Sequence, residues 1–294
     1  MHIKRNVLLT YLAFLLPGLL VYTLIRVVPL LMSFRYSLTN WDGYAVSYDF
    51  IGFKNYLDLF NDEAVMQAMK NTLFFGLVNP LLITVLAIPL ALLLNSKLRG
   101  TSVYRAVFFF PSVPSALIIG YIWLFIFDPT DSGVLNRLLG FFHMDKVLWL
   151  ADPNLAMLSI LFVSVWKAVG WHSCIYIANL QTISGEYYEA AKIDGASAWQ
   201  RFWNITFPML APGMSISLML ILVDSLKIFE LPFALTKGGP GYSTTMLTQI
   251  IIERGINEHM IGRASAMSMV FIAMIFIISS IQLSISRRRE GKLQ

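Results

Sequence analysis

Residues 186–208, EYYEAAKIDGASAWQRFWNITFP, form the longest mixed polar segment of an otherwise strongly apolar chain. The beginning of this segment holds good helix formers and no proline, and Gly195 follows them as a C-cap. Ser197, with Gln200 three residues later, is the pattern of a capping box at the start of a second helix. We expect Pro208 to end that helix, because proline lacks the backbone N–H that a helix interior requires. The segment therefore predicts a helix, a turn and another helix.

The rest of the chain has the composition of an integral membrane protein. Hydrophobic residues make up 57% of the 294 residues and charged residues 13%, against about 25% charged residues in an average soluble domain. The net charge of +5 comes from basic residues beside apolar runs, and no basic and aromatic platform for nucleic acid is present. The single cysteine, Cys174, excludes a disulfide framework within the chain. The sequence also contains no Walker motif and no metal-ligand spacing.

Apolar runs long enough to cross a bilayer as helices recur along the whole chain. We expect one all-α transmembrane domain over residues 1–294, with six spans. The spans are predicted near 8–31, 72–94, 104–127, 155–181, 209–231 and 266–286. The first is expected to be retained, because no convincing small-residue cleavage site follows it. Pro111 and Pro114 predict a bend in the third span.

Basic residues in the connections predict the orientation of the chain in the membrane. With six spans, the N-terminus, the tight second connection, the 184–208 loop and the C-terminal tail all fall on one side, and each contains Lys or Arg. The positive-inside rule places that side in the cytoplasm. The connection 128–154 is expected outside the cell, and its Asp, Pro and Gly residues indicate turns.

Glu189-Ala190-Ala191, Gly195 and the Ile-Thr-Phe-Pro run that ends at Pro208 resemble the EAA loop of permease subunits in bacterial ABC importers. In that family the loop is cytoplasmic and forms a coupling helix that docks into a cleft of the ATPase subunit. The resemblance carries this role to Glu189, Ala190, Ala191, Asp194, Gly195 and Pro208. Residues 37–41 and 50–56 resemble the sugar-importer branch of the family, which has a short extracytoplasmic helix before the second span.

Two later spans contain charged residues that are unusual inside a membrane. Lys167 and Trp171 are four residues apart in the fourth span, so they share a helix face. An intramembrane lysine costs about 2.5–3.5 kcal/mol on insertion scales, so Lys167 should face a polar cavity or a carboxylate. The alternative is a lysine that snorkels to the membrane surface beside interfacial tryptophans. In the fifth span, Asp224, Lys227 and Glu230 follow one another at intervals of three, which would allow ion pairing within one helix.

The run from Ser225 to Pro240 resembles the corresponding segment of carbohydrate-importer permeases, in which this span and the fourth contact the sugar. The resemblance implies a substrate pathway lined by Lys167, Ala168, Trp171, Asp224, Ser225 and Ile228.

The resemblance extends over nearly the whole chain and implies the type I ABC importer permease fold. It implies a multi-pass protein of the bacterial plasma membrane with both termini in the cytoplasm. The implied partners are a second homologous permease that completes a heterodimer, two ATPase subunits and an extracytoplasmic solute-binding protein that delivers a sugar or oligosaccharide. ATP and Mg²⁺ would bind to the ATPase subunits. This chain is therefore expected to be a transporter subunit in lipid and not an enzyme, with no cofactor, metal or nucleic acid of its own.

Other substrates and another transporter class remain as alternatives. Importers of glycerol phosphate, polyamine or other small polar solutes share the EAA loop. A polyamine should favour carboxylates along the pathway and a phosphate ester should favour Arg and Lys, whereas the mixed charges of Lys167, Asp224 and Lys227 fit a neutral polyol better. An ion-coupled secondary transporter would need an internal inverted repeat and its own coupling site, and the sequence displays neither.

Overall fold

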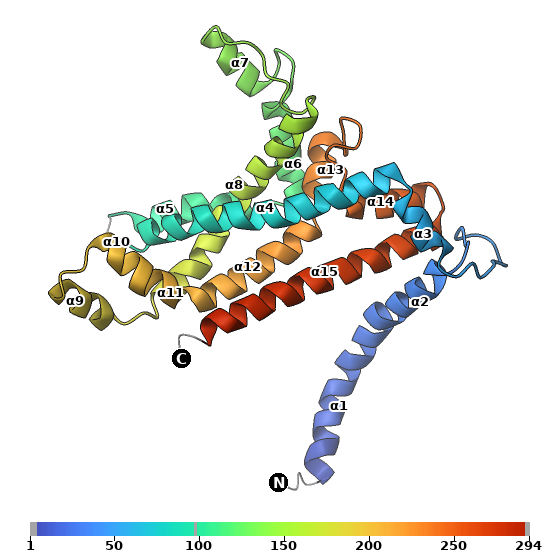
Figure 1. Ribbon diagram of the computed structural model, residues 1–294, viewed down its shortest axis with the longest axis horizontal. Coiled ribbons are helices and arrows are strands. Elements are labelled where there is room, and N and C mark those ends of the chain that lie inside the picture. The colour runs from blue at the N-terminus through green and yellow to red at the C-terminus, as the bar shows by residue number, and fades with distance from the viewer. Residues whose placement is uncertain (1–4, 97–98, 292–294) are drawn as a thin grey trace. The chain divides into compact units, whose positions relative to one another are not determined.

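The computed structural model describes residues 5–96 and 99–291, and the regular elements of this part of the chain are helices (Figure 1). The predicted all-α fold is therefore confirmed. Contacts divide the molecule into two compact units. The first runs to Glu63 and also contains Ile250–Ala273, and the second comprises Ala64–Gln249 and continues from Met274.

Within the described residues, up to six helical stretches are long and apolar enough to cross a membrane. The continuous ones are Tyr11–Ser37, Glu63–Leu94, Pro153–Leu180 and Ile261–Arg288. Two more are bent pairs, Thr101–Ser112 with Ala116–Ile126 and Ala198–Met209 with Ala211–Leu226. Each of the six predicted apolar runs overlaps one of these stretches.

The first unit gathers segments from both ends of the chain. Its elements are α1 (Arg5–Tyr22), the π-helical turn η1 (Thr23–Val27), α2 (Val28–Ser37), α3 (Lys54–Phe60), the end of α14 (Leu247–Ile252), the π-helical turn η4 (Glu253–Asn257) and the beginning of α15 (Ile261–Glu290). The short helix expected before the second span is α3. The Asp62 carboxylate accepts hydrogen bonds from Arg254 at 3.2 Å and Arg263 at 2.9 Å. These bonds connect the end of the α3 segment to the residues around η4.

The second unit contains the remaining elements. They are α4 (Glu63–Leu94), α5 (Thr101–Phe109), the 3₁₀ turn η2 (Phe110–Ser112), α6 (Ala116–Ile126), α7 (Val134–Phe141), α8 (Pro153–Leu180), α9 (Gly185–Ile193), α10 (Ala198–Arg201), the π-helical turn η3 (Phe202–Thr206), α11 (Phe207–Met209), α12 (Ala211–Leu226) and α13 (Glu230–Thr236). Two apolar clusters form its core, one around Ile83 and Tyr176 and the other around Phe75 and Ile160.

The backbones of α5 and α8 meet at Gly170. A Cβ atom at this position would lie 1.8 Å from the carbonyl oxygen of Phe108. Because the obstacle is backbone, a side chain at position 170 could not be accommodated by a change of rotamer. Gly170 therefore permits the contact between the third and fourth spans.

The third span bends between α5 and α6. The two halves meet at 92°, and the break contains Pro114 and Ser115 just after Pro111 in η2. Proline removes a backbone donor and so interrupts the helical hydrogen bonds. Ser115 then caps α6 by accepting a hydrogen bond from the Ile118 N–H at 3.4 Å. The bend predicted from the paired prolines is confirmed.

Pro208 does not end the helix of residues 198–209, contrary to the sequence-based expectation. The helical run passes through η3 and α11, and its 64° bend against α12 follows Met209. Pro208 lies in the first turn of α11. Proline is tolerated there, because a first-turn N–H has no partner within its own helix. The π-helical turn η3 comes just before α11 and interrupts the regular α-helical hydrogen bonding, so α11 begins as a new helical turn.

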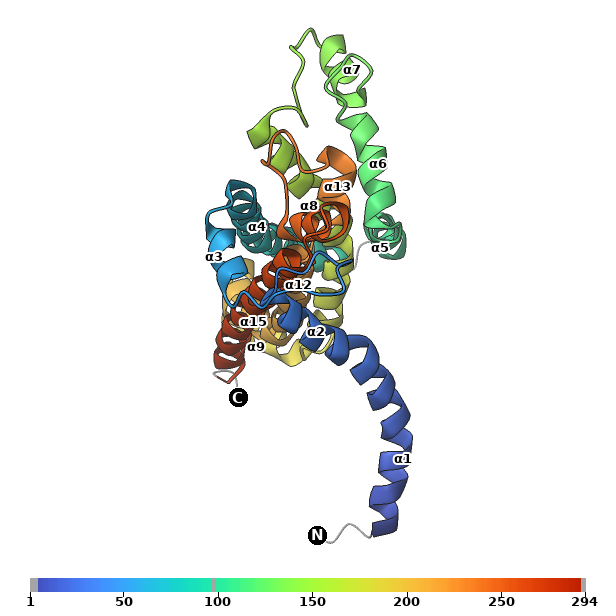
Figure 2. The same cartoon turned by 90° about the vertical axis from the view of Figure 1, so that its right-hand side faces the viewer.

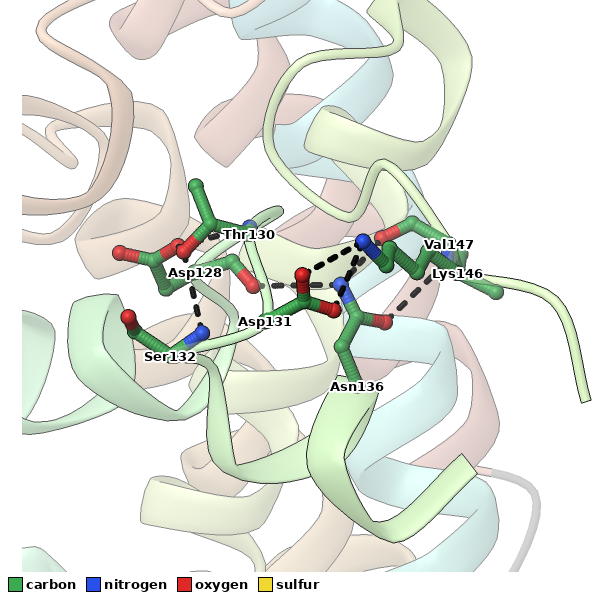
Figure 3. A network of polar contacts seen from close by, with 7 residues as sticks. All are labelled: Asp128, Thr130, Asp131, Ser132, Asn136, Lys146 and Val147. Atoms are coloured by element: carbon green, nitrogen blue, oxygen red, sulfur yellow. Dashed lines mark hydrogen bonds and ion pairs between the residues drawn. The ribbon is translucent and has the colours of Figure 1, made fainter. Parts of the chain in front are cut away.

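The loop between α6 and α8 is organised by Asn136 of α7. Its Nδ2 donates to the Val147 oxygen at 3.0 Å and the Asp128 oxygen at 3.3 Å, and its Oδ1 accepts from the Val147 N–H and the Trp149 Nε1–H, each at 3.1 Å. Figure 3 shows the contacts of Asn136 with Asp128 and Val147, beside the turn at Asp128 and Thr130. In Figure 2, α6 leads from α5 to α7 at its far end. The turn-rich connection is therefore an ordered loop.

Candidate functional site

A cavity of about 460 Å³ lies in the second unit between α8, the end of α12 and the segment that leads into α13. It is lined by Asn79, Ile83, Ala116, Ser164, Lys167, Ala168, His172, Ile221, Asp224, Ser225, Lys227, Ile228, Phe229, Glu230 and Leu231. Five of the six predicted pathway residues are therefore brought together: Lys167, Ala168, Asp224, Ser225 and Ile228.

Trp171 is the predicted pathway residue that the structure does not bring to the cavity wall. Its side chain is 38% exposed and packs edge to face on His172, with the ring centroids 4.6 Å apart. Ser164, Ala168 and His172 form an i, i+4 ridge of α8 that lines the cavity. Trp171 continues the neighbouring ridge from Lys167, and sequence spacing alone could not tell which ridge would extend along the wall.

The fifth span breaks where the sequence suggested a continuous polar helix. Helix α12 ends at Leu226, Lys227 is its C-cap, and α13 begins at Glu230. The ion pairing that the sequence allowed among Asp224, Lys227 and Glu230 is not found in the described residues. Helical spacing extends to Lys227, whose N–H donates to the Val223 carbonyl oxygen at 3.1 Å, and is lost between Lys227 and Glu230. The salt bridges found in the described part of the chain include none of these three residues. Their charges instead gather around the cavity.

The polar wall of the cavity rests on hydrogen bonds between helices. Asn79 Nδ2 of α4 donates to Ser225 Oγ of α12 at 2.9 Å. His172 Nδ1 of α8 and Ser217 Oγ of α12 are also 2.9 Å apart. All four side chains are buried. These bonds fix α4 and α8 against α12, the helix that connects the cavity to the 184–208 loop.

The charged groups of the cavity can pair with a neutral, hydroxyl-rich molecule. Lys167 and Lys227 contribute ammonium donors, whereas Asp224 and Glu230 contribute carboxylate acceptors. The formal charges of these four groups sum to zero. A sugar hydroxyl both donates and accepts hydrogen bonds, so it can bond to either kind of group.

Asn79, Ser164 and Ser217 take part in this site although sequence reasoning assigned them no role. Asn79 and Ser164 line the cavity, and Ser217 supports it through His172. A polar residue within an apolar span is a signal of this kind of site. In this chain that signal was too common to select among the many serines and asparagines of the spans.

The 184–208 loop folds as its sequence predicts up to Pro208. Ser184 caps α9, accepting from the Glu186 N–H at 3.3 Å. Gly195 adopts a left-handed conformation with φ of +76°. The predicted capping box is present: the Ser197 N–H donates to Gln200 Oε1 at 2.7 Å, and the Gln200 N–H donates to Ser197 Oγ at 3.3 Å.

The surface of this loop is unusually apolar for a polar connection. Ile193 is 87% exposed and Trp199 is 71% exposed. Of the residues carried over from the EAA loop, Glu189, Ala190, Asp194 and Gly195 are exposed, and Ala191 and Pro208 are half-buried. Exposed apolar area rimmed by polar residues is typical of a protein interface.

The family described as binding-protein-dependent transport system inner membrane component matches residues 65–291. The match covers more than half of the chain, so the chain belongs to this family. It is therefore a multi-pass membrane protein and the permease subunit of an ABC transporter, not an enzyme, and its fold is that of the type I importer permeases. Family membership also implies a solute-binding protein as a partner.

Particular relatives and a solved structure resemble almost the whole chain. The probable starch degradation products transport system permease protein AmyD of Thermoanaerobacterium thermosulfurigenes is 31% identical over 291 residues, which cover 96% of each protein. The diacetylchitobiose uptake system permease protein NgcF of Streptomyces coelicolor is 31% identical over 294 residues, 96% of this chain and 83% of NgcF. A bacterial alginate ABC transporter, solved in complex with an alginate pentasaccharide-bound periplasmic protein, contains a chain that is 26% identical with a TM-score of 0.83. That match covers 97% of this chain and 96% of the solved chain.

Proposed function

We propose that this chain is a permease subunit of an ATP-driven importer that takes up a neutral sugar or oligosaccharide delivered by an extracytoplasmic binding protein. The observation that supports this substrate class is the cavity, whose two ammonium groups and two carboxylates suit a neutral polyol. The names of AmyD and NgcF, which refer to starch degradation products and diacetylchitobiose, favour the same class.

Lys167, Ala168, Asp224, Ser225 and Ile228 are proposed to line the sugar pathway in this subunit. Trp171 lies outside the cavity wall, so we propose that it contacts lipid or a second, homologous permease subunit. That second subunit would complete the passage as the other half of a heterodimer.

Two ATPase subunits are proposed to drive the cycle, one of them docked on the loop 184–208. The exposed Ile193 and Trp199 provide an apolar contact, and Glu189 and Asp194 provide charges beside it. ATP and Mg²⁺ would be bound by those partners and would supply the energy of the cycle. Because η3 and α11 form the end of the loop and lead directly into α12, a displacement of the loop would also move the Asp224 and Ser225 side of the cavity.

The loop is proposed to face the cytoplasm, with the α7 loop outside. The two loops lie at opposite ends of α8 (Figure 1), whose 28 residues are about 42 Å long at 1.5 Å per residue. In a Cys174→Ser background, single cysteines at Ser102 or Ser197 should react with an impermeant maleimide only from the cytoplasm. A cysteine at Ser132, which is exposed, should react only from outside. The reverse pattern would refute this orientation.

The substrate class is tested with the reconstituted transporter and its binding protein. Neutral oligosaccharides should stimulate ATP hydrolysis and be taken up, whereas glycerol phosphate and polyamines should do neither. Stimulation by a phosphate ester or a polyamine alone would refute the sugar assignment. Uptake driven by an ion gradient without ATP would refute the importer assignment.

A further inference from the structure

Tyr188 is a tyrosine of α9 that turns away from the exposed surface of the docking loop. Most residues of α9 are exposed, and Tyr188 and Ala191, three residues apart, are the half-buried ones. The Tyr188 hydroxyl lies 3.0 Å from the Thr206 Oγ1 in η3. Of the side-chain hydrogen bonds found in the described residues, it is the one that connects α9 directly to the helix beyond the Gly195 turn.

Thr206 is buried and forms hydrogen bonds with both α9 and the backbone around η3, so a movement of α9 would also displace η3. It is 5% exposed, and its Oγ1 donates to the Arg201 carbonyl oxygen at 3.4 Å, across the π-helical turn. With its own hydrogen directed at Arg201, the Thr206 oxygen is left to accept the hydrogen of the Tyr188 hydroxyl. The Thr206 carbonyl in turn accepts from the Leu210 N–H at 3.0 Å, at the bend that precedes α12.

The covalent route between α9 and η3 is less direct. It passes through Gly195, whose left-handed conformation forms a turn, and then through the four residues of α10. Rotation about backbone bonds in a glycine turn absorbs displacement. The Tyr188 bond bypasses that turn and reaches the π-helical turn, an element that is frequent at functional sites in helices.

We propose that Tyr188 and Thr206 are positioning residues that transmit movement of the docking helix α9 to α12 and so to the cavity wall. This inference rests on the proposed function, because it takes α9 to be the surface on which an ATPase docks. Without the hydrogen bond, α9 still docks, but the Gly195 turn absorbs part of its displacement. ATP is then hydrolysed with less sugar moved per cycle.

The test uses the complete transporter with its binding protein in proteoliposomes, and the main readout is sugar transported per ATP hydrolysed. Tyr188→Phe and Thr206→Val each remove one hydroxyl and keep the shape of the side chain. Loss of one hydrogen bond of ordinary strength should lower the ratio by about threefold to tenfold. The double variant should be no worse than Thr206→Val alone, because both lack the Tyr188–Thr206 bond and the Thr206 bond to the Arg201 carbonyl oxygen.

Two matched variants separate this role from a general loss of structure. Tyr187→Phe makes the same chemical change one residue earlier, on a side chain that is 54% exposed. Thr206→Ser keeps the hydroxyl while it removes a methyl group. Both should retain the wild-type ratio of sugar to ATP, and all the variants should co-purify with the ATPase subunits as the wild type does.

An unchanged ratio in Tyr188→Phe would overturn the inference, and so would an equal fall in Tyr187→Phe. A ratio in the double variant equal to the product of the two single effects would also overturn it. Loss of the ATPase subunits from Tyr188→Phe alone would make Tyr188 part of the docking contact and refute its role in transmission. Failure of the proposed function is distinct, because the wild-type complex would then lack ATPase subunits or sugar-stimulated hydrolysis.

Discussion

Asn79 Nδ2 donates a hydrogen bond to Ser225 Oγ over 2.9 Å, which joins α4 to the last turn of α12 at the cavity wall. Both side chains are buried, and Asn79 Oδ1 has no hydrogen-bond partner among the described residues. Because one acceptor of this buried amide is already unsatisfied, loss of the bond to Ser225 would leave the Asn79 side chain with no hydrogen bond among the described residues. The pair therefore holds the fifth span in register with the second just before α12 ends.

Ser225→Ala should destabilise the subunit by about 1–3 kcal/mol, because it leaves the Asn79 amide donor buried without its partner. The double variant Asn79→Ala with Ser225→Ala should be more stable than the sum of the two single effects predicts. Thermal unfolding of the purified complex measures all three. Strict additivity would show that the two side chains do not depend on each other.

Lys167→Met should raise the sugar concentration for half-maximal uptake by about tenfold or more, because it removes a charged hydrogen-bond donor from the cavity wall. Trp171→Ala should change this concentration by less than about twofold, because Trp171 lies outside the wall and loses no bond to the sugar. Uptake rates over a range of sugar concentrations distinguish the two. A larger effect of Trp171→Ala would place the pathway on the other ridge of α8.

Features that depend on neighbouring residues in sequence were predictable. The Ser197 and Gln200 capping box, the Gly195 turn and the bend at the paired prolines each follow from the chemistry of a few adjacent residues. The apolar runs were predictable for the same reason, since one run of residues is enough to indicate a span.

Features that depend on packing between helices were not predictable in this way. The end of α12 at Leu226 has no proline or glycine beside it, so helical spacing seemed to continue to Glu230. The support of the cavity by Asn79 depends on a contact with Ser225, which is 146 residues away in sequence. Sequence periodicity can restrict a residue to a helix face, but the neighbouring helix decides what that face contacts.

Gly170→Ala should destabilise the subunit by about 3 kcal/mol or more, because the new methyl group meets the Phe108 carbonyl oxygen. The matched control is Gly140→Ala in α7, where a Cβ atom meets no atom within 4 Å. This control should stabilise α7 by about 0.5–1 kcal/mol. The fraction of folded protein after heating in detergent compares them. Similar behaviour of the two variants would contradict the close approach of α5 and α8.

Gly195→Val should cost about 1–2 kcal/mol, because a β-branched residue is strained at a φ of +76°. Gly195→Asn is the control, because asparagine tolerates the left-handed region and no atom lies within 4 Å of a Cβ atom here. We expect Gly195→Val, and not Gly195→Asn, to reduce co-purification of the ATPase subunits. Equal retention of the ATPase subunits by both would show that docking does not depend on this turn.

Acid should loosen the α7 loop through Asp128. Hydrogen bonds from the Thr130 hydroxyl and N–H hold the pKa of the Asp128 carboxyl below its ordinary value of 3.8. Since the folded pKa is the lower one, this contribution to loop stability is fully present above 3.8 and is lost as the pH falls through the folded value. Hydrogen exchange of residues 128–136, corrected for the intrinsic pH dependence of exchange, should therefore accelerate below pH 3.8.

Thr130→Val removes the hydroxyl that donates to Asp128 and should move the pKa of Asp128 back toward 3.8. The loop of this variant should exchange faster already at neutral pH and should show a smaller further change in acid. Thr130→Ser keeps the hydroxyl and should behave like the wild type. If Thr130→Val and wild type lose protection equally as the pH falls, the acid sensitivity of the loop must come from another carboxylate. The bonds between Thr130 and Asp128 would then make no pH-dependent contribution to its order.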